Sequence, residues 1–253
     1  MQKLPHLLTY RESFKIRTYE TGQKKEATLA HLLKLMHEAA MQNVIDLKVS
    51  VWDLEKAQIS WVIRQMRFRV QRLPQLGETI TIETHPAGFH RLFTYRDYRV
   101  FDADGQLIAE AASKWLLMDT QNRRLAPIPA DFIVRFKMPD PADCLPRPEL
   151  KLPPWQSAER QRTFRVAWYD LDFNGHLNNV VYLNWMLEAL APPVLQNGQL
   201  QQLDIIYRAE AQWQDEVRAE VQTLDTHRFL HRLVRTNDQK ELATALTDWT
   251  PNQ

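Results

Sequence analysis

The feature that most limits how this chain can fold is an internal repeat. Phe14-Lys15-Ile16 matches Phe164-Arg165-Val166, and further similar residues follow in register without a gap. Both halves also show the same order of patterns, a helical periodicity followed by several strand-like runs. This repeated order predicts two copies of one structural unit. Other matched pairs are Tyr19 with Tyr169, Leu33 with Leu183, Met36 with Met186, Glu38 with Glu188 and, after a change in spacing, Trp115 with Trp249.

Each copy is predicted to contain one long helix. Residues 28–47 carry apolar side chains at helical spacing, whereas residues 180–190 are apolar on almost every face and end before Pro192-Pro193. A helix that is apolar all round has to be buried all round. With one long helix and several strands per unit, this is achieved only if the sheet curls around the helix. The sequence therefore predicts an α+β fold, a tandem (double) hot dog in which each half is a long helix wrapped by a curled antiparallel sheet.

Strand-like alternation and turn residues place four long strands in each half. Six prolines between Pro139 and Pro154 predict a stiff, extended connector. We therefore expect an N-terminal hot-dog domain at 1–138, a proline-rich linker at 139–155 and a C-terminal hot-dog domain at 156–253. The expected strands are 61–72, 79–84, 92–101 and 107–118 in the first half, and 203–213, 216–223, 228–235 and 241–249 in the second.

Composition excludes several classes of protein. Of the 253 residues 44% are hydrophobic, which is ordinary for a globular chain, and the net charge of +1 gives no indication of nucleic-acid binding. No apolar stretch is long enough for membrane insertion, and no N-terminal signal pattern is visible. The single cysteine, Cys144, excludes an intramolecular disulfide, so we expect a cytoplasmic protein. Cys144 is expected to be an ordinary thiol, and His85, His90, His227 and His231 are expected to be structural or exposed.

The candidate for chemistry is a polar segment in the second half. Asp172, Asn174 and His176 are spaced by two, which points all three to one side of an extended segment. Gly175 interrupts the segment, and Asn178 and Asn179 are suited to cap the following helix. The start of a helix favours developing negative charge. This arrangement suits attack on a carbonyl group.

The first half lacks this polar cluster. The positions that match Asp172, Asn174 and His176 are Gly22, Lys24 and Glu26. The fold itself therefore does not require the cluster, which favours a chemical role for it. The first half is left to another task, such as binding part of a substrate.

A calcium site is the competing interpretation of the same segment. Residues 170–175 (DLDFNG) match the opening of an EF-hand loop. That loop needs an acidic ligand at its twelfth position, where this chain has Val181, and a helix before it, where this chain is strand-like. We therefore expect no metal at this segment.

Residues 170–182 (DLDFNGHLNNVVY) and 185–188 (WMLE) together form a long and specific motif. This motif resembles the signature of the acyl-acyl-carrier-protein (acyl-ACP) thioesterases of plants and bacteria. Shorter similarities extend over most of the chain. They are 14–20 (FKIRTYE), 86–88 (PAG) with Arg91, Arg96-Asp97, 113–115 (SKW), Asp119 and Arg123-Arg124.

The resemblance implies hydrolysis of fatty acyl-ACP without a cofactor, with Asp172, Asn174, His176 and Glu210 as the catalytic set. Plant members usually have a cysteine directly after this glutamate, but here the residue is Ala211, so attack by an activated water remains. Glu210 or His176 would be the base, and Asn174 would bind the water or the carbonyl. Asp172 would orient His176 or Asn174, and backbone N–H groups of residues 175–179 would stabilise the oxyanion.

The implied partners are an acidic acyl carrier protein, bound transiently, and a fatty acyl chain held between the helices and the first sheet. A basic docking surface is expected, and a homodimer is left open because many hot-dog proteins pair. An acyl-CoA thioesterase on the same fold and a non-catalytic acyl-binding protein are the alternatives. The candidate substrate- or carrier-binding residues are Arg64, Arg67, Arg69, Arg91, Arg96, Asn178 and Asn179, with Arg72, Arg99, Arg123 and Arg124 nearby.

Overall fold

The computed structural model describes residues 7–251. The chain divides into two compact units, Met1–Pro148 and Glu149–Gln253. The division lies inside the stretch 139–155 that was expected to be a linker. No helix in the described part of the chain is both long and apolar enough to cross a membrane.

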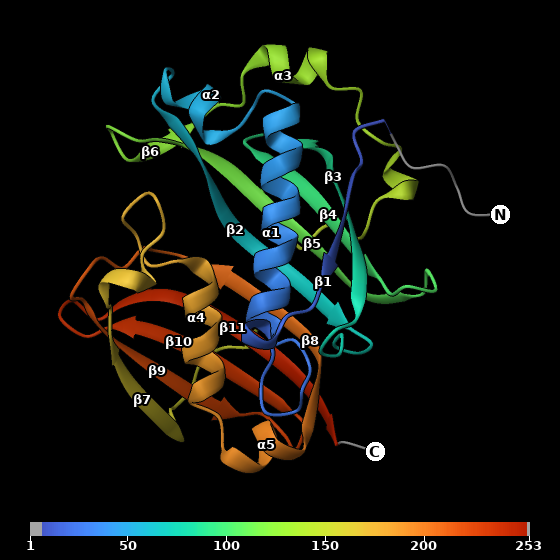
Figure 1. Ribbon diagram of the computed structural model, residues 1–253. Coiled ribbons are helices and arrows are strands. Elements are labelled where there is room, and N and C mark those ends of the chain that lie inside the picture. Colours follow the sequence, from blue (N-terminus) through green and yellow to red (C-terminus); the bar gives the residue numbers. More distant parts are fainter. Residues whose placement is uncertain (1–6, 252–253) are drawn as a thin grey trace. The chain divides into compact units, whose positions relative to one another are not determined.

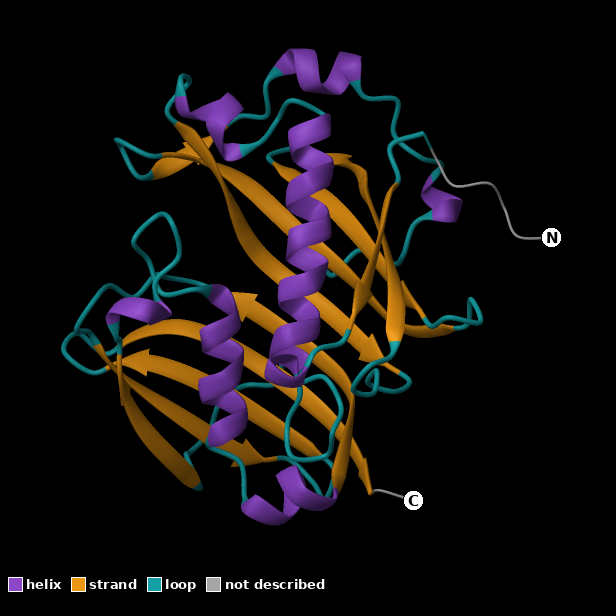
Figure 2. Ribbon diagram, in the orientation of Figure 1, coloured by secondary structure: helices purple, strands orange, loops and turns teal. Residues whose placement is uncertain are grey.

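The first unit is a curved antiparallel sheet with one long helix against it (Figures 1 and 2). Its strand order is β1-β3-β4-β5-β2, and the short β6 pairs with β5. Helix α1 packs on β1 and β3. The strands are β1 (Tyr10–Lys15), β2 (Ile59–Val70), β3 (Thr79–His90), β4 (Phe93–Phe101), β5 (Leu107–Asp119) and β6 (Arg124–Ala126), and the helices are η1 (Thr18–Glu20), α1 (Leu29–Asp46), α2 (Val51–Glu55), α3 (Ala130–Arg135) and η2 (Pro141–Asp143).

Helix α1 follows the predicted pattern closely. Thr28 is its N-cap, with the side-chain oxygen accepting a hydrogen bond from the His31 amide at 3.2 Å, and Leu47 is its C-cap. The face that carries Leu32, Leu33 and Met36 is fully buried. The prediction of a helix over 28–47 is therefore confirmed, with the first and last of these residues acting as the caps.

Strand β3 is longer than predicted. We expected it to end at Thr84, but it continues to His90 through a change of register against β4 between Pro86 and Gly88. Such an irregularity lets a strand continue past a proline, which cannot donate to the ladder. The glycine is also needed, because Gly88 has φ of +125°, which side-chain-bearing residues rarely adopt.

The second unit repeats the first (Figure 1). Its strand order is β7-β9-β10-β11-β8, which equals β1-β3-β4-β5-β2 of the first sheet with each strand replaced by its counterpart. Helix α4 packs on β7, β9 and β10. The elements are β7 (Arg160–Arg165), η3 (Trp168–Asp170), α4 (Asn179–Glu188), α5 (Pro192–Asn197), β8 (Gly198–Tyr207), β9 (Glu216–Thr223), β10 (Arg228–Arg235) and β11 (Lys240–Pro251). Two hot-dog units follow one another in the chain, as predicted.

Helix α4 is buried on most of its circumference. Leu183 and Met186 are fully enclosed, whereas Asn184 and Glu188 are exposed. Pro192 and Pro193 were expected only to stop this helix. They also begin α5, because proline is well accommodated in the first turn of a helix, where an amide donor is not needed.

The backbone hydrogen bonds also reveal the duplication. In the second unit the Asp172 amide donates to the His176 carbonyl, and the Gly175 amide donates to the Asp172 carbonyl. In the first unit the Gly22 amide donates to Glu26 and the Lys25 amide to Gly22 in the same pattern. Lys25 and Gly175 both have positive φ, of 59° and 75°. The two loops therefore share one backbone conformation although their side chains differ.

The first part of the proline-rich stretch belongs to the first unit and packs against its sheet. The Leu145 amide donates a 2.6 Å hydrogen bond to the Asp97 carboxylate, and the Arg147 guanidinium lies 4.6 Å from the centre of the Tyr95 ring. Tyr95 and Asp97 are alternate residues of β4, so they share one face of the sheet. The segment therefore covers the face of β4 that carries these two side chains.

Candidate active site

The loop between η3 and α4 carries three of the four predicted catalytic residues. The Asp172 carboxylate accepts hydrogen bonds from the backbone amides of Asn174 at 2.8 Å and of His176 at 3.1 Å. Gly175 supplies the positive φ that closes the turn. Asp172 was expected to orient the side chain of His176 or Asn174. In the structure it bonds the backbone of both residues, because short acidic side chains readily bind amides one turn ahead.

The His176 imidazole and the Glu210 carboxylate meet. Nε2 of His176 lies 3.3 Å from Oε2 of Glu210, with the two side chains 22% and 29% exposed. The pair is therefore sheltered but still open to a small molecule. Neighbouring acid and imidazole groups at this distance can share a proton and take one from a bound water.

Glu210 lies on an irregular segment after β8, and hydrogen bonds hold the backbone on both sides of it. The Tyr182 hydroxyl of α4 donates to the Ala209 carbonyl and accepts from the Ala211 amide, each at 3.1 Å. Arg235 donates to the carbonyl of Glu210 itself at 3.2 Å. Burial raises the pKa of Tyr182, so its hydroxyl keeps the proton that it donates.

Sequence reasoning did not assign a role to Tyr182 or Arg235. Tyr182 lies in the apolar run 180–190 and was counted there as a packing residue. Its only signal was a hydroxyl on a helix that is otherwise apolar, since buried tyrosine hydroxyls need a partner. Arg235 gave no signal.

The predicted oxyanion donors are already in use. We expected backbone N–H groups of residues 175–179 to stabilise a developing negative charge. That prediction is wrong for four of the five residues, because their amides donate within the protein. Gly175 donates to the Asp172 carbonyl, His176 to the Asp172 carboxylate, Leu177 to the Ala211 carbonyl and Asn178 to the Asp170 carbonyl.

Asn174, in contrast, is exposed, and its side-chain amide makes no hydrogen bond within the described residues. It can therefore donate to a ligand. The two residues that follow the loop act on the helix. Asn178 is the N-cap of α4 and accepts from the Val180 amide at 3.0 Å, and the Asn179 carbonyl accepts from the Tyr207 hydroxyl at 3.3 Å. Capping, which the sequence predicted, is the function that the Asn178 side chain has here.

Matched hydrogen bonds identify the counterpart of Glu210 in the first unit. The Leu177 amide donates to Ala211, and the Ala27 amide donates in the same way to Pro74. The residue that precedes Pro74, as Glu210 precedes Ala211, is Leu73. The first unit thus lacks the carboxylate as well as the histidine, which extends the difference between the two copies.

The candidate docking arginines fall into different environments. Arg96 is buried, and its guanidinium donates to the side chains of Asn43 at 2.9 Å and Thr84 at 3.0 Å. The prediction that Arg96 belongs to an exposed docking surface is therefore wrong, because β4 directs it toward α1. Burial also lowers its pKa.

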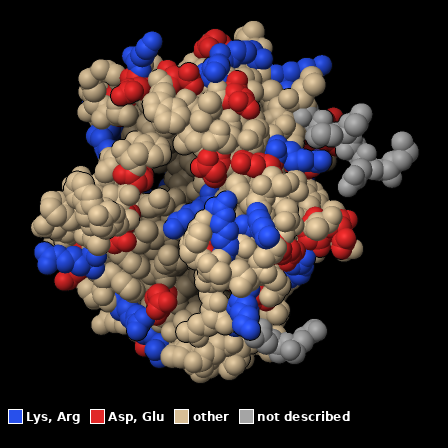
Figure 3. Space-filling model, viewed as in Figure 1, with Lys and Arg blue, Asp and Glu red and all other residues tan. Residues whose placement is uncertain are grey.

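The remaining arginines of that prediction reach the surface to different extents. Arg69 of β2 and Arg91 of the β3–β4 turn are exposed, while Arg64 and Arg67 are half-buried. Arg69 pairs with Glu110 at 3.4 Å, which offsets part of its charge. In Figure 3 basic and acidic side chains are interspersed on the face shown. Any docking surface on this face is thus a local feature and not a broad basic field.

Two folded units of hot-dog type define a double hot-dog protein, and in the second unit the side chains of His176 and Glu210 form a pair. Residues 7–136 match the acyl-ACP thioesterase N-terminal domain, and residues 155–251 match the acyl-ACP thioesterase C-terminal domain. The chain belongs to the acyl-ACP thioesterase family.

Individual relatives agree with this assignment. The chain is 30% identical to a chloroplastic acyl-[acyl-carrier-protein] hydrolase of Cuphea viscosissima over 96% of its own length and 63% of that protein. It is 29% identical to the chloroplastic oleoyl-acyl carrier protein thioesterase 2 of Arabidopsis thaliana, over 90% and 67% of the two chains. It therefore spans about two thirds of the length of these relatives. The fold is similar to that of the 12:0-ACP thioesterase from Umbellularia californica, with a TM-score of 0.87, 23% identity and 98% and 99% of the chains covered.

Proposed function

We propose that this chain hydrolyses the thioester of fatty acyl-acyl carrier protein and releases a free fatty acid and the holo carrier. The observation that carries the proposal is the 3.3 Å approach of His176 Nε2 to Glu210 Oε2 in a member of this family. The two residues lie on segments far apart in sequence, and both side chains remain accessible.

In the proposed reaction, the oxygen of a bound water attacks the thioester carbonyl carbon. The His176–Glu210 pair takes the proton from that water, with either residue as the immediate base. The tetrahedral intermediate then collapses, the C–S bond breaks, and the sulfur of the carrier's prosthetic group receives the proton. Ala211, in place of the cysteine common in plant members, supports attack by water instead of by a thiol.

We propose that the side-chain amide of Asn174 forms a hydrogen bond with the thioester carbonyl oxygen or with the attacking water. Its exposure and its lack of a bond within the described residues support this role, since four backbone amides near it are already committed. A hydrogen-bond donor aimed at the oxyanion typically lowers the activation barrier by about 3–4 kcal/mol. Asp172 serves the reaction by holding the loop backbone in shape.

The first unit is proposed to bind the acyl chain, because it keeps the fold but has lost the polar residues. Carrier docking is assigned to Arg67 and Arg69, which lie on one side of β2, with Arg91 as an additional contact. Alternate residues of a strand share a face, so these two side chains can contact one acidic partner together. A cytoplasmic location remains part of the proposal, based on the single cysteine.

Two variants test the chemistry. Glu210→Ala and His176→Ala should each lower turnover by at least about a hundredfold while the protein stays folded. His227→Ala and Glu159→Ala are matched controls, because both residues are exposed in the same unit, and they should retain normal turnover. Full activity in either site variant would remove that residue from the catalytic set.

The alternative functions are separated by substrate. Acyl-ACP and acyl-CoA of several chain lengths should be compared in one assay, and we expect the higher kcat/KM with the carrier protein. A preference for acyl-CoA would indicate the alternative thioesterase. Binding of acyl chains without hydrolysis of either substrate would indicate a non-catalytic protein.

A further inference from the structure

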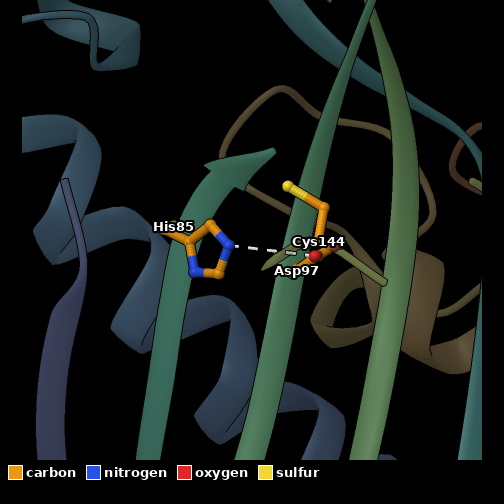
Figure 4. A group of neighbouring side chains, drawn as sticks. All are labelled: His85, Asp97 and Cys144. Atoms are coloured by element: carbon orange, nitrogen blue, oxygen red, sulfur yellow. Dashed lines mark ion pairs between the residues drawn. The ribbon is translucent and has the colours of Figure 1, made fainter. Parts of the chain in front are cut away.

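Three side chains of metal-ligating type meet in the first unit. His85 comes from β3, Asp97 from β4 and Cys144 from the proline-rich segment just after η2 (Figure 4). One ligand atom from each lies within 4.8 Å of the others, and His85 Nε2 is 3.8 Å from Asp97 Oδ2. In the described part of the chain, no other three His, Cys, Asp or Glu side chains come together in this way.

The group is largely shielded from solvent. His85 is 6% and Asp97 2% exposed, and Cys144 is half-buried. Burial raises the pKa of the Asp97 carboxyl to about 6, and burial together with that carboxylate raises the pKa of the Cys144 thiol to about 11. Burying a carboxylate next to a thiol is unfavourable unless a cation or hydrogen bonds compensate. The Leu145 amide supplies one such hydrogen bond to Asp97.

A cavity adjoins the group. It has a volume of about 300 Å³ and is lined by Asp97, Cys144, Tyr95, Arg147 and the prolines of residues 141–148. Two of the three candidate ligands therefore face a space that can admit a water molecule, which needs only about 30 Å³. The Arg147 guanidinium in the same wall is suited to an anionic fourth ligand.

We propose that His85, Asp97 and Cys144 form a binding site for a transition-metal dication of the Zn²⁺ class. An imidazole nitrogen, a carboxylate oxygen and a thiolate make up the mixed donor set that Zn²⁺ accepts, whereas Ca²⁺ and Mg²⁺ require oxygen ligands. Bond lengths of about 2.0–2.3 Å in a tetrahedral site bring ligand atoms to about 3.3–3.8 Å from one another. The ligand atoms, which lie within 4.8 Å of one another, need to approach by about 1–1.5 Å at most to reach this geometry.

Water or an anion in the cavity takes the fourth position. Binding displaces the Cys144 thiol proton and the weak hydrogen bonds that its sulfur donates to the carbonyls of Ala87 at 3.7 Å and Asp140 at 3.5 Å. The consequence is structural. One ion fastens the segment that bears Cys144 to two neighbouring strands of the first sheet.

Cobalt titration of the full-length protein tests the site. Co²⁺ bound to a thiolate gives a near-ultraviolet charge-transfer band, and tetrahedral Co²⁺ gives strong visible bands. We expect both bands to saturate at one equivalent and to disappear when Zn²⁺ is added. Cys144→Ser should abolish the charge-transfer band and lower Zn²⁺ affinity at least tenfold, as loss of a ligand does. His90→Ala is the matched control, since His90 is an exposed histidine at the end of the same strand, and it should leave both bands intact.

Thermal unfolding gives a second measurement that does not depend on a spectrum. Zn²⁺ should raise the Tm of the wild-type protein, because a ligand of the folded state stabilises it, and should leave the Tm of Cys144→Ser unchanged. His85→Gln should behave like Cys144→Ser. The proposal is overturned if the wild-type protein shows no charge-transfer band. Equal Zn²⁺ affinity and equal Tm shifts in wild type and Cys144→Ser would also overturn it, since the metal would then be bound elsewhere.

Discussion

Replacing Tyr182 by phenylalanine removes one oxygen atom and tests how Glu210 is held in place. The ring and its packing against Tyr207, at a centroid distance of 5.7 Å, are retained. The hydrogen bond to the Ala209 carbonyl and the one from the Ala211 amide are both lost. Glu210 lies between these two residues, so its backbone loses its attachment to α4.

The structural cost can be estimated from the two bonds. Ala211 is fully buried, so its amide becomes an unsatisfied buried donor, which costs about 1–3 kcal/mol. The bond to the Ala209 carbonyl adds about 1 kcal/mol. The total of about 2–4 kcal/mol is less than the stability of a typical protein, about 5–15 kcal/mol, so the variant should still fold.

Tyr182→Phe should also lower kcat, although Tyr182 is not proposed to touch the substrate. Misplacement of a reacting group by about 1 Å can lower a rate by about a hundredfold. We therefore expect kcat to fall by about ten- to a hundredfold with little change in KM. Turnover of acyl-ACP should be measured at 25 °C, together with urea unfolding and the pH profile of kcat, which should shift if the His176–Glu210 distance changes.

Tyr207→Phe is the matched control. The Tyr207 hydroxyl donates to the Asn179 carbonyl on the same helix, whereas the Tyr182 hydroxyl bonds both neighbours of Glu210. The Tyr207→Phe variant should be less stable than the wild type, but its kcat should fall much less than that of Tyr182→Phe. Equal kcat in Tyr182→Phe and the wild type, or equal losses in both variants, would refute the idea that Tyr182 positions Glu210.

Three further predictions concern acid stability, docking and capping. Burial lowers the pKa of His231 to about 4, whereas a histidine in an unfolded chain has a pKa of about 6.5. The unfolded state therefore binds the proton at a higher pH than the folded state does. As a result, the free energy of unfolding falls as the pH drops from about 6.5 toward about 4. In urea unfolding at about pH 7 and about pH 4.5, His231→Gln should reduce this loss by about 2–3 kcal/mol, and an unchanged loss would show that His231 is not responsible. Arg69→Glu should raise KM for acyl-ACP severalfold at low salt and much less at high salt, and a KM that is insensitive to salt would exclude Arg69 from docking. Asn178→Ala should cost about 1 kcal/mol through loss of the α4 cap, and an unaltered unfolding midpoint would contradict that role.

Much of the fold was predictable because its periodicities are strong. The predicted helix 28–47 agrees with α1 to within one residue at each end, and strands β9 and β10 have the predicted ends. The failures have local causes. The strand expected at 79–84 was placed on its alternating Ile and Thr or Glu residues, but a change in ladder register between Pro86 and Gly88 lets β3 continue to His90. Pro192 and Pro193 suggested only a stop, although proline also favours a first helical turn.

The candidate site was less predictable. Asp172, Asn174 and His176 are visible in sequence because they lie within five residues. Glu210 is an ordinary glutamate until the fold brings it to His176, and only the family resemblance pointed to it. Arg96 was misassigned because alternation does not say which face of a strand is outward. In this sheet the Tyr95–Asp97 face of β4 is covered by residues 144–148, and the Arg96 face is turned to α1.

The loop of the first unit has the backbone conformation of the loop that carries the candidate catalytic residues, with Gly22, Lys24 and Glu26 in place of Asp172, Asn174 and His176. The main-chain bonds that the two loops share therefore form with two different sets of side chains at these positions. Such a loop can exchange its chemistry without refolding, which makes the first unit a natural host for a transplanted site. Such a transplant would also need a glutamate in place of Leu73, because Leu73 is the counterpart of Glu210 in the second unit.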